Sequence, residues 1–518
     1  MKVNVTTSPQ SKKFSHPKYR SDIDGLRAVA VLSVVGFHAF PSWFNGGFVG
    51  VDIFFVISGF LISTIIFGNL EQNTFGFFEF YSRRVKRIFP ALLIVLIACY
   101  TFGWFALFAD EFKQLGKHIA AGAGFISNLV LWSESGYFDN AADTKPLLHL
   151  WSLGIEEQFY IFWPLLLWAV WKTRFNLLTV TIAIAIASFA FNIWGIRTDA
   201  VATFYSPQTR FWELLSGSLL AWFTLHRKAT KFHHRLYHWL RVVVYTQAPT
   251  TDRSYLRNLQ AYLGAALIIA AVVLTTKSSQ FPGWRALLPT LGAVLMIAAG
   301  MQAWLNRVIL SNKILVWFGL ISFPLYLWHW PLLSFARIVE SEVPALGIRI
   351  AAVSLSVLLA WLTYELVEKP IRFGSHTKAK TFALLVLMFI VGSIGYSTYQ
   401  RNGLKFREPI EYKDYIAQTI EQQFSDKCSL HFEKINHCAE RIKKGQSIVL
   451  LLGDSHVRHT YELIKEQVAN ANHDLVAFSN GGCPFLIDVN TAYVNDCGLK
   501  NKEVMEFIMG GFKHEVQL

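Results

Sequence analysis

The chain has 518 residues, of which 53% are hydrophobic and only 16% are charged. Charged residues make up about 25% of an ordinary soluble domain, so the composition excludes a wholly soluble protein and places most of the chain in a membrane. The net charge of +13 would suggest nucleic-acid binding in a soluble protein. In a polytopic membrane protein the same excess is typical of Lys and Arg in cytoplasmic loops, so no nucleic-acid partner is expected.

Eleven apolar runs follow a polar and basic segment, residues 1–25, which shows no signal-peptide pattern. Each run is long enough, or nearly so, to cross about 30 Å of hydrocarbon. The runs are 26–44, 48–67, 88–108, 149–171, 177–196, 211–225, 259–274, 286–305, 314–335, 350–367 and 381–399. A further candidate, 119–132, is short and interrupted by Gly122 and Gly124, which indicates a re-entrant or interfacial segment.

Basic residues predict the orientation of these runs. With the N-terminus in the cytoplasm, the cytoplasmic loops contain RRVKR at 83–87, the basic stretch 226–241 and the lysines of 369–380. The opposite loops hold fewer Lys and Arg, which satisfies the positive-inside rule. Eleven crossings then place the C-terminal tail outside the cytoplasm.

The cysteines point to the same orientation. Cys99 lies in an apolar run and is expected to be a small buried hydrophobe. The other four, Cys428, Cys438, Cys483 and Cys497, lie in the polar tail. An even number of cysteines confined to one polar region suggests disulfides and an oxidising, extracytoplasmic compartment. Of the three possible pairings, we expect Cys428 with Cys438 and Cys483 with Cys497.

The polar tail changes character at Ser447, where an α/β pattern begins. In the stretch IVLLLGDSHVRHTYELI, five apolar residues lead into a turn that contains Ser455, and a helical pattern follows. This order predicts a strand that delivers a serine to a tight turn at the edge of an α/β sheet.

Ionisable residues interrupt the apolar runs, where they are costly and usually face a cavity. Arg27 begins the first run, and His38 follows eleven residues later, about 16 Å along a helix. Their depths place Arg27, Arg84 and Arg87 near the cytoplasmic side. A second group is expected nearer the opposite side: His38, Asp52, His149, Glu156, Glu157 and His329.

Each of these residues has a structural and a functional interpretation. The 83–87 stretch could be only a topology signal, His149 and His329 could be interfacial anchors beside tryptophans, and Asp52 could cap a helix. The functional interpretation is an active site that spans the bilayer. A buried histidine beside a carboxylate can act as a general base on a hydroxyl, and arginines suit a phosphate-bearing donor.

Six stretches between residues 19 and 373 resemble acyltransferase family 3, the polytopic carbohydrate O-acyltransferases. They are YRSDIDGLRAVAVLSVVGFHAF, GGFVGVDIFFVISGFLIS, FYSRRVKRIFPALL, LLHLWSLGIEEQFYIFWPLLL, ISFPLYLWHWPLL and YELVEKPIRF. Arg27 with His38 reproduces the family's Arg–ten–His spacing, and Arg84 with Arg87 its Arg-x-x-Arg. The resemblance implies transfer of an acyl group, usually acetyl, from cytoplasmic acetyl-CoA to an extracytoplasmic sugar hydroxyl, with His38 essential.

The tail resembles the SGNH hydrolase-like domain fused to many such proteins. Ser455 falls at the nucleophile position, and Gly481 in the sequence GGCP matches the glycine block. No Gly-x-Asn block and no Asp-x-x-His block occurs before Leu518. We therefore expect a partial SGNH-like domain, degenerate or cut short, that lacks the catalytic base of the fold, so that Ser455 is dispensable for activity.

These features together predict an α-helical polytopic membrane protein of about 11 spans followed by a partial α/β SGNH-like extracytoplasmic domain. The expected parts are a cytoplasmic segment, an acyltransferase domain, an additional transmembrane helix, a linker and the SGNH-like domain. Their ranges are 1–25, 26–373, 374–400, 401–446 and 447–518. The expected location is a bacterial cytoplasmic (inner) membrane, with the tail in the periplasm.

The expected enzyme is an O-acyltransferase that uses acetyl-CoA as donor and no metal. The acceptor would be a cell-surface polysaccharide or glycolipid, such as lipopolysaccharide O-antigen, peptidoglycan or exopolysaccharide. Glu156 or Glu157 would support His38 near this acceptor. The alternative is a transporter or flippase of a surface-glycan precursor, although the lack of internal repeats argues against it. A third possibility, an esterase anchored by its membrane domain, is disfavoured by the missing base.

Overall fold

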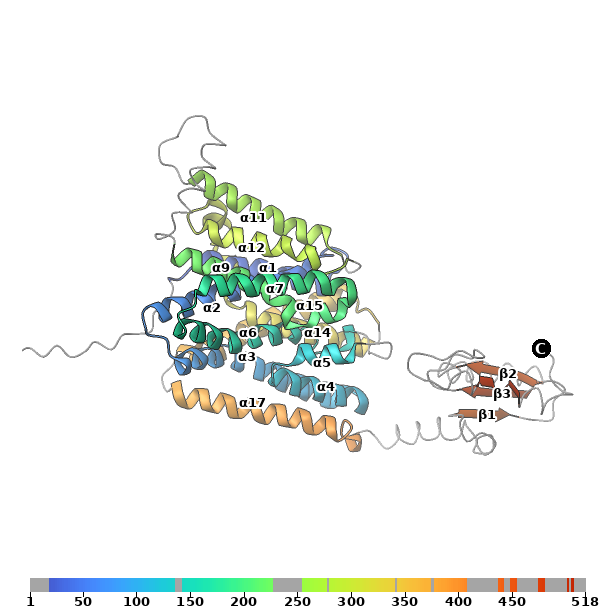
Figure 1. Cartoon of the computed structure of the whole chain (residues 1–518). Coiled ribbons are helices and arrows are strands. Elements are labelled where there is room, and N and C mark those ends of the chain that lie inside the picture. Colours follow the sequence, from blue (N-terminus) through green and yellow to red (C-terminus); the bar gives the residue numbers. More distant parts are fainter. Residues whose placement is uncertain are drawn as a thin grey trace, which may run out of the picture. The chain divides into compact units, whose positions relative to one another are not determined.

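The computed structural model describes residues 18–135, 142–226, 254–276, 279–340, 342–373, 377–407, 437–441, 448–453, 474–479, 501–502 and 505–506. The chain divides into two compact units, Met1–Lys405 and Phe406–Leu518. The first unit is helical, and the second contains the strands (Figure 1).

Each of the eleven apolar runs overlaps a helix of the first unit. The helices that form the bundle are α1 (Ser21–Ala39), α2 (Gly50–Glu71), α3 (Phe77–Ala106), α4 (Ala109–Ala123), α5 (Ser127–Glu134), α6 (Leu150–Lys172), α7 (Leu177–Thr198), α8 (Ala200–Tyr205), α9 (Pro207–Leu225), α11 (Ser254–Leu274), α12 (Leu287–Ala299), α13 (Lys313–Leu320), α14 (Ser322–Glu340), α15 (Leu346–Thr363), α16 (Lys369–Phe373) and α17 (Thr377–Gln400).

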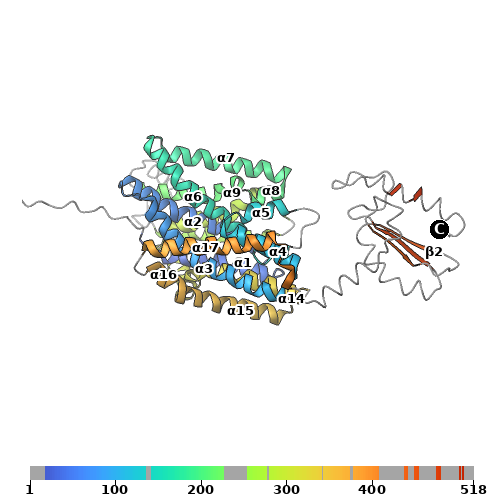
Figure 2. The same cartoon turned by 90° about the horizontal axis from the view of Figure 1, so that it is seen from below.

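These helices lie alongside one another. In Figure 1, α11 and α12 lie at one edge of the bundle and α17 at the other, where it packs against α3 and α4. After a turn of 90°, α7 and α15 mark the other two edges (Figure 2).

Six helical segments among the described residues are long and apolar enough to cross a membrane: Gly47–Glu71, Phe77–Ala106, Leu177–Thr198, Ser254–Leu274, Leu346–Phe373 and Thr377–Gln400. The pair α13 and α14, bent by 67° at its break, makes a seventh if it counts as one span. These numbers are lower than the eleven expected because the remaining runs form helices that are shorter or more charged. The helix α12 has 13 residues, and α1, α6 and α9 each contain two or more ionisable residues.

The interrupted segment 119–132 forms two helices with a break between them. The helix α4 ends at Ala123, α5 begins at Ser127, and Phe125 between them has a φ of 55°. A residue in this left-handed region cannot continue a right-handed helix. The interruption therefore separates α4 from α5.

Glycines allow a close crossing of α2 and α9. A Cβ added to Gly59 would overlap the carbonyl group of Leu214, and a Cβ added to Gly217 would overlap that of Val56. Small residues at such crossings let two backbones approach closely, which is a main source of helix association in lipid. The crossing lies near the middle of both helices and holds α2 close beside α9.

The second unit is described mainly through three strands. Strand order is β1 (His437–Arg441), β3 (Asp474–Ser479), β2 (Ile448–Gly453). The pair β2 and β3 is parallel, which requires a crossover connection and is typical of an α/β fold. The strand predicted before Ser455 is confirmed as β2.

Several tail residues lie outside the described part of the chain. They are Ser455, Gly481, Cys428, Cys483 and Cys497. Cys438 lies in β1, where only the backbone is described. The expected disulfides and the serine turn therefore stay predictions. Cys99, in α3, is a buried free cysteine, as expected.

Candidate active site

Two cavities lie at different depths along α1. The larger, about 410 Å³, is lined by His38 near the end of the helix, and we name it the histidine cavity. The smaller, about 90 Å³, is lined by Arg27, Arg84 and Arg87, and we name it the arginine cavity. Arg27 and His38 are about 16 Å apart along the helix, so one helix contributes a charged residue to each cavity.

A second histidine holds His38 in place. The Nδ1 atom of His38 lies 2.9 Å from Nε2 of His329. The Nδ1 atom of His329 lies 2.7 Å from the carbonyl oxygen of Tyr326. The two imidazole rings are stacked, with 12° between their planes. His329 is fully buried, whereas His38 lines the cavity.

This chain of hydrogen bonds selects the tautomers of both histidines. A carbonyl oxygen only accepts, so Nδ1 of His329 carries the proton and its Nε2 is an acceptor. Nδ1 of His38 must then donate to that acceptor. The basic lone pair of His38 is therefore on Nε2.

Tyr326 extends the network to α6. Its hydroxyl donates to the carbonyl oxygen of His149 at 2.8 Å and lies 2.7 Å from Oγ of Ser152. The His149 ring is buried, lines the histidine cavity and lies 5.8 Å from the His329 ring, measured between centroids. The structure thus brings together the three histidines that the sequence assigned to one depth.

Glu156 and Glu157 line the arginine cavity instead of the histidine cavity. The carboxylate of Glu156 accepts hydrogen bonds from Ser58 and Tyr160, both at 3.1 Å. This corrects the expectation that one of these glutamates supports His38. They lie in the second turn of α6, about 10 Å from its start, which is deep enough to reach Ser58 on α2.

The arginine cavity has an excess of positive charge. Three arginines and two glutamates line it, which leaves one net positive charge when all five are ionised. Arg27 pairs with Asp24 at 3.4 Å. The Nε atom of Arg84 is buried and has no hydrogen-bond partner in the described part of the chain. These donors can bind a phosphate oxygen.

Asp52 lines the histidine cavity and pairs with a residue that the sequence analysis missed. Its Oδ1 lies 3.0 Å from Nη2 of Arg210, and the same nitrogen lies 3.3 Å from Glu213. All three side chains are fully buried. The expected run 211–225 began one residue too late to include Arg210. The sequence analysis also missed Glu213, and charge inside or at the edge of an apolar run was the signal that could have found both residues.

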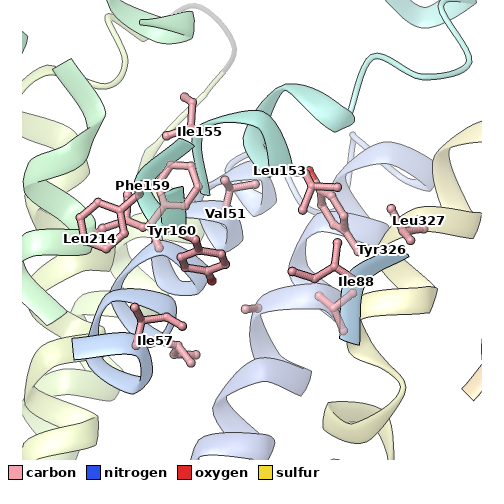
Figure 3. Packing of buried hydrophobic residues seen from close by; sticks show 14 of the residues in the cluster. Val51, Ile57, Ile88, Leu153, Ile155, Phe159, Tyr160, Leu214, Tyr326 and Leu327 are labelled. Carbon is pink, nitrogen blue, oxygen red and sulfur yellow. The ribbon is translucent and has the colours of Figure 1, made fainter. Parts of the chain in front are cut away.

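The two cavities adjoin, and we name the place where they meet the neck. Val51 and Tyr326 are the described residues that line both of them. Figure 3 shows Val51 on α2 and Tyr326 on α14 within the buried apolar packing of the helices. The basic histidine and the arginine donors therefore lie on opposite sides of this neck.

Buried polar groups at two depths of a helical bundle fit a membrane-embedded acyltransferase. The chain is a member of acyltransferase family 3, because the model of that family's acyltransferase domain matches residues 20–365. The model of the SGNH domain that is fused to such domains matches residues 422–511. Both resemblances stated from the sequence are thereby confirmed.

Curated relatives of the chain are named as O-acetyltransferases. The peptidoglycan O-acetyltransferase OatA of Listeria monocytogenes is 31% identical over 68% of this chain and 56% of its own length. The candidate peptidoglycan O-acetyltransferase YrhL of Bacillus subtilis is 32% identical over 70% of this chain and 56% of its own. The chain thus spans just over half the length of these relatives. No solved structure matches the chain.

Proposed function

We propose that the protein transfers an acetyl group from acetyl-CoA to a hydroxyl group of a cell-surface glycan. The observation that carries this proposal is the pair of adjoining cavities, one with an oriented histidine and one with excess arginine. The names of the relatives support acetyl as the acyl group. They also favour peptidoglycan over lipopolysaccharide or exopolysaccharide as the acceptor.

The spacing of the two cavities fits the donor. An extended chain covers about 3.5 Å for every three bonds, so a pantetheine arm of about twelve bonds between phosphate and sulfur covers about 14 Å. The eleven residues from Arg27 to His38 span about 16 Å. Phosphates held in the arginine cavity would therefore place the thioester near His38. No covalent acyl-enzyme is needed, but Tyr326 must turn aside to admit the arm.

The reaction then follows from the tautomer of His38. Its Nε2 takes the proton of the acceptor hydroxyl while that oxygen attacks the thioester carbonyl carbon. The imidazolium that forms is stabilised because His38 Nδ1 donates to His329. The tetrahedral intermediate breaks its carbon–sulfur bond, and the departing thiolate receives the proton as CoA. General-base help of this kind contributes about a hundredfold to ten-thousandfold in rate.

The same proposal sets the orientation. The arginine cavity faces the cytoplasm, where acetyl-CoA is made, and the histidine cavity faces the opposite side of the cytoplasmic membrane. On this proposal, the eleven crossings expected from the sequence would put the SGNH domain on the same side as the acceptor. A transporter or flippase would need a continuous path for a whole glycan, and the hydrogen-bonded Tyr326 between the two cavities argues against one.

Measuring glycan O-acetylation in cells tests the function directly. Cells that produce the protein should gain O-acetyl groups on their isolated peptidoglycan, and cells that lack it should not. An unchanged acetyl content in every surface glycan, with the protein correctly inserted in the membrane, would contradict the proposal.

We expect Arg84→Ala to weaken acetyl-CoA binding about tenfold to a hundredfold, because a hydrogen bond to a charged group contributes about 1.5–3 kcal/mol. Arg83→Ala is the matched control. Arg83 is adjacent in sequence but pairs with Glu79 and does not line the cavity. Calorimetry on the purified variants measures both affinities. Unchanged acetyl-CoA affinity in the Arg84→Ala protein would mean that Arg84 is only a topology signal.

Thiol labelling tests the placement of the tail. In intact cells whose outer barrier is opened, an impermeant maleimide should label the tail cysteines only after reduction, because oxidised thiols do not react. Buried Cys99 should remain unlabelled in both conditions. Labelling that requires rupture of the cytoplasmic membrane would place the tail inside.

A further inference from the structure

Arg210 has no part in the reaction described above, although it lines the same cavity as His38. Its side chain is fully buried. Nη2 contacts Asp52 and Glu213, whereas Nε and Nη1 have no hydrogen-bond partner in the described part of the chain. Buried donors without partners are costly, so these two nitrogens mark a place for a ligand.

Aromatic rings enclose the guanidinium group. Its central carbon lies 5.6 Å from the ring centroid of Phe281, 5.7 Å from that of Trp151 and 5.8 Å from that of Phe204. These three residues line the histidine cavity together with Asp52 and Arg210, whereas Glu213 does not. We name the five lining residues the Arg210 floor.

The charges of the cluster restrict what can bind there. Two carboxylates already face the single guanidinium. A carboxylate on the ligand would be the third in the cluster and would be repelled by both. A neutral oxygen can accept from the open N–H groups without such a penalty. The rings favour an apolar group beside that oxygen. The ligand class is therefore a neutral carbonyl that carries a methyl or similar group.

We propose that the Arg210 floor is an acceptor subsite that binds the acetamido group of a 2-acetamido sugar. The carbonyl oxygen accepts a hydrogen bond from Arg210, and the methyl group packs against the rings of Trp151 and Phe281. The cavity volume of about 410 Å³ lies within the usual range for ligand sites, about 300–1,000 Å³. The proposal rests on the proposed function, because it assigns the acceptor to the histidine cavity.

Matched oligosaccharides test the ligand class on the purified full-length protein in lipid nanodiscs. Chitotetraose carries an acetamido group on each ring, its fully deacetylated form carries amines, and cellotetraose carries hydroxyls. Calorimetry should show chitotetraose binding at least about tenfold more tightly than the other two. No detectable chitotetraose binding, or equal binding of cellotetraose, would overturn the proposal.

Variants test the residue. Arg210→Lys retains the positive charge beside Asp52 but removes the planar set of donors, and it should weaken chitotetraose binding about tenfold to a hundredfold. Glu213→Gln is the matched control, because Glu213 contacts Arg210 without lining the cavity. It should retain the wild-type affinity. Equal losses in both variants would show that the cluster is structural only.

Two further measurements keep the test decisive. If Arg210→Lys does not fold, Phe281→Leu should weaken chitotetraose binding and leave acetyl-CoA affinity unchanged. Unchanged chitotetraose affinity in this variant would overturn the subsite.

Acetyl transfer separates this proposal from the proposed function. Tight chitotetraose binding without transfer would contradict the function alone, whereas transfer to cellotetraose at the chitotetraose rate would contradict the subsite alone.

Discussion

Replacing His38 with glutamine should lower the rate of acetyl transfer about a hundredfold to ten-thousandfold, the usual contribution of a general base. Glutamine can still reach His329 with its amide, but it has no basic nitrogen with which to accept the proton of the acceptor. Acetyl-CoA affinity should stay near that of the wild type, because the arginine cavity is unaltered. Transfer of radiolabelled acetyl groups to purified glycan, together with donor calorimetry, measures the two effects.

His226→Gln is the control for this substitution. His226 pairs with Glu71 and lines neither cavity, so its loss should leave transfer unchanged. Full activity of the His38→Gln protein would refute a base at this position. Loss of donor binding in parallel with transfer would instead show that His38 supports the structure of the bundle.

Two variants at His329 should show whether this residue acts through its hydrogen bond with His38 or only by packing against it. His329→Phe keeps a ring against His38 but removes the nitrogen that accepts from His38 Nδ1. The tautomer of His38 is then no longer selected and the imidazolium loses its partner, so kcat should fall about a hundredfold or more. His329→Gln can offer an amide oxygen in place of Nε2 and should restore part of the lost kcat.

The kinetic parameters identify the role. A positioning residue changes kcat and leaves the KM for the donor near its wild-type value, whereas a disturbed fold would change both. Equal activity of the phenylalanine and glutamine variants would show that the hydrogen bond from His38 has no catalytic effect. Membrane insertion and thermal stability, measured on both variants, make the comparison valid.

The helices could be predicted from sequence because long apolar runs have few alternatives in a membrane. On the first helix, relative depth could be predicted as well, since a helix rises by 1.5 Å per residue. This rule separated Arg27 from His38, and the structure places them in different cavities. Every apolar run overlaps a helix, although only six described helical segments, or seven with the bent pair, are long and apolar enough to cross a membrane.

Lateral neighbours could not be predicted in this way. Depth does not determine which face of a helix a residue occupies, and consecutive residues point about 100° apart. For Glu156 the expected depth was also wrong, because it lines the arginine cavity and contacts Ser58 and Tyr160 instead of His38. The contact between His38 and His329 joins residues 291 positions apart. Only the packing of α1 against α14 brings them together.

The neck at Tyr326 has a consequence for the energy supply of the cell. An aqueous pore open at both ends would let protons run down the electrochemical gradient, and each charge that crosses dissipates about 2.3 kcal/mol per 100 mV. The Tyr326 hydroxyl is hydrogen-bonded to Ser152 and to the His149 carbonyl, and Val51 also lines the neck. In the proposed reaction, the donor arm would fill the opening as it displaces the tyrosine, so the path would stay closed to protons. Acetyl groups would then leave the cytoplasm while the membrane remains an electrical insulator.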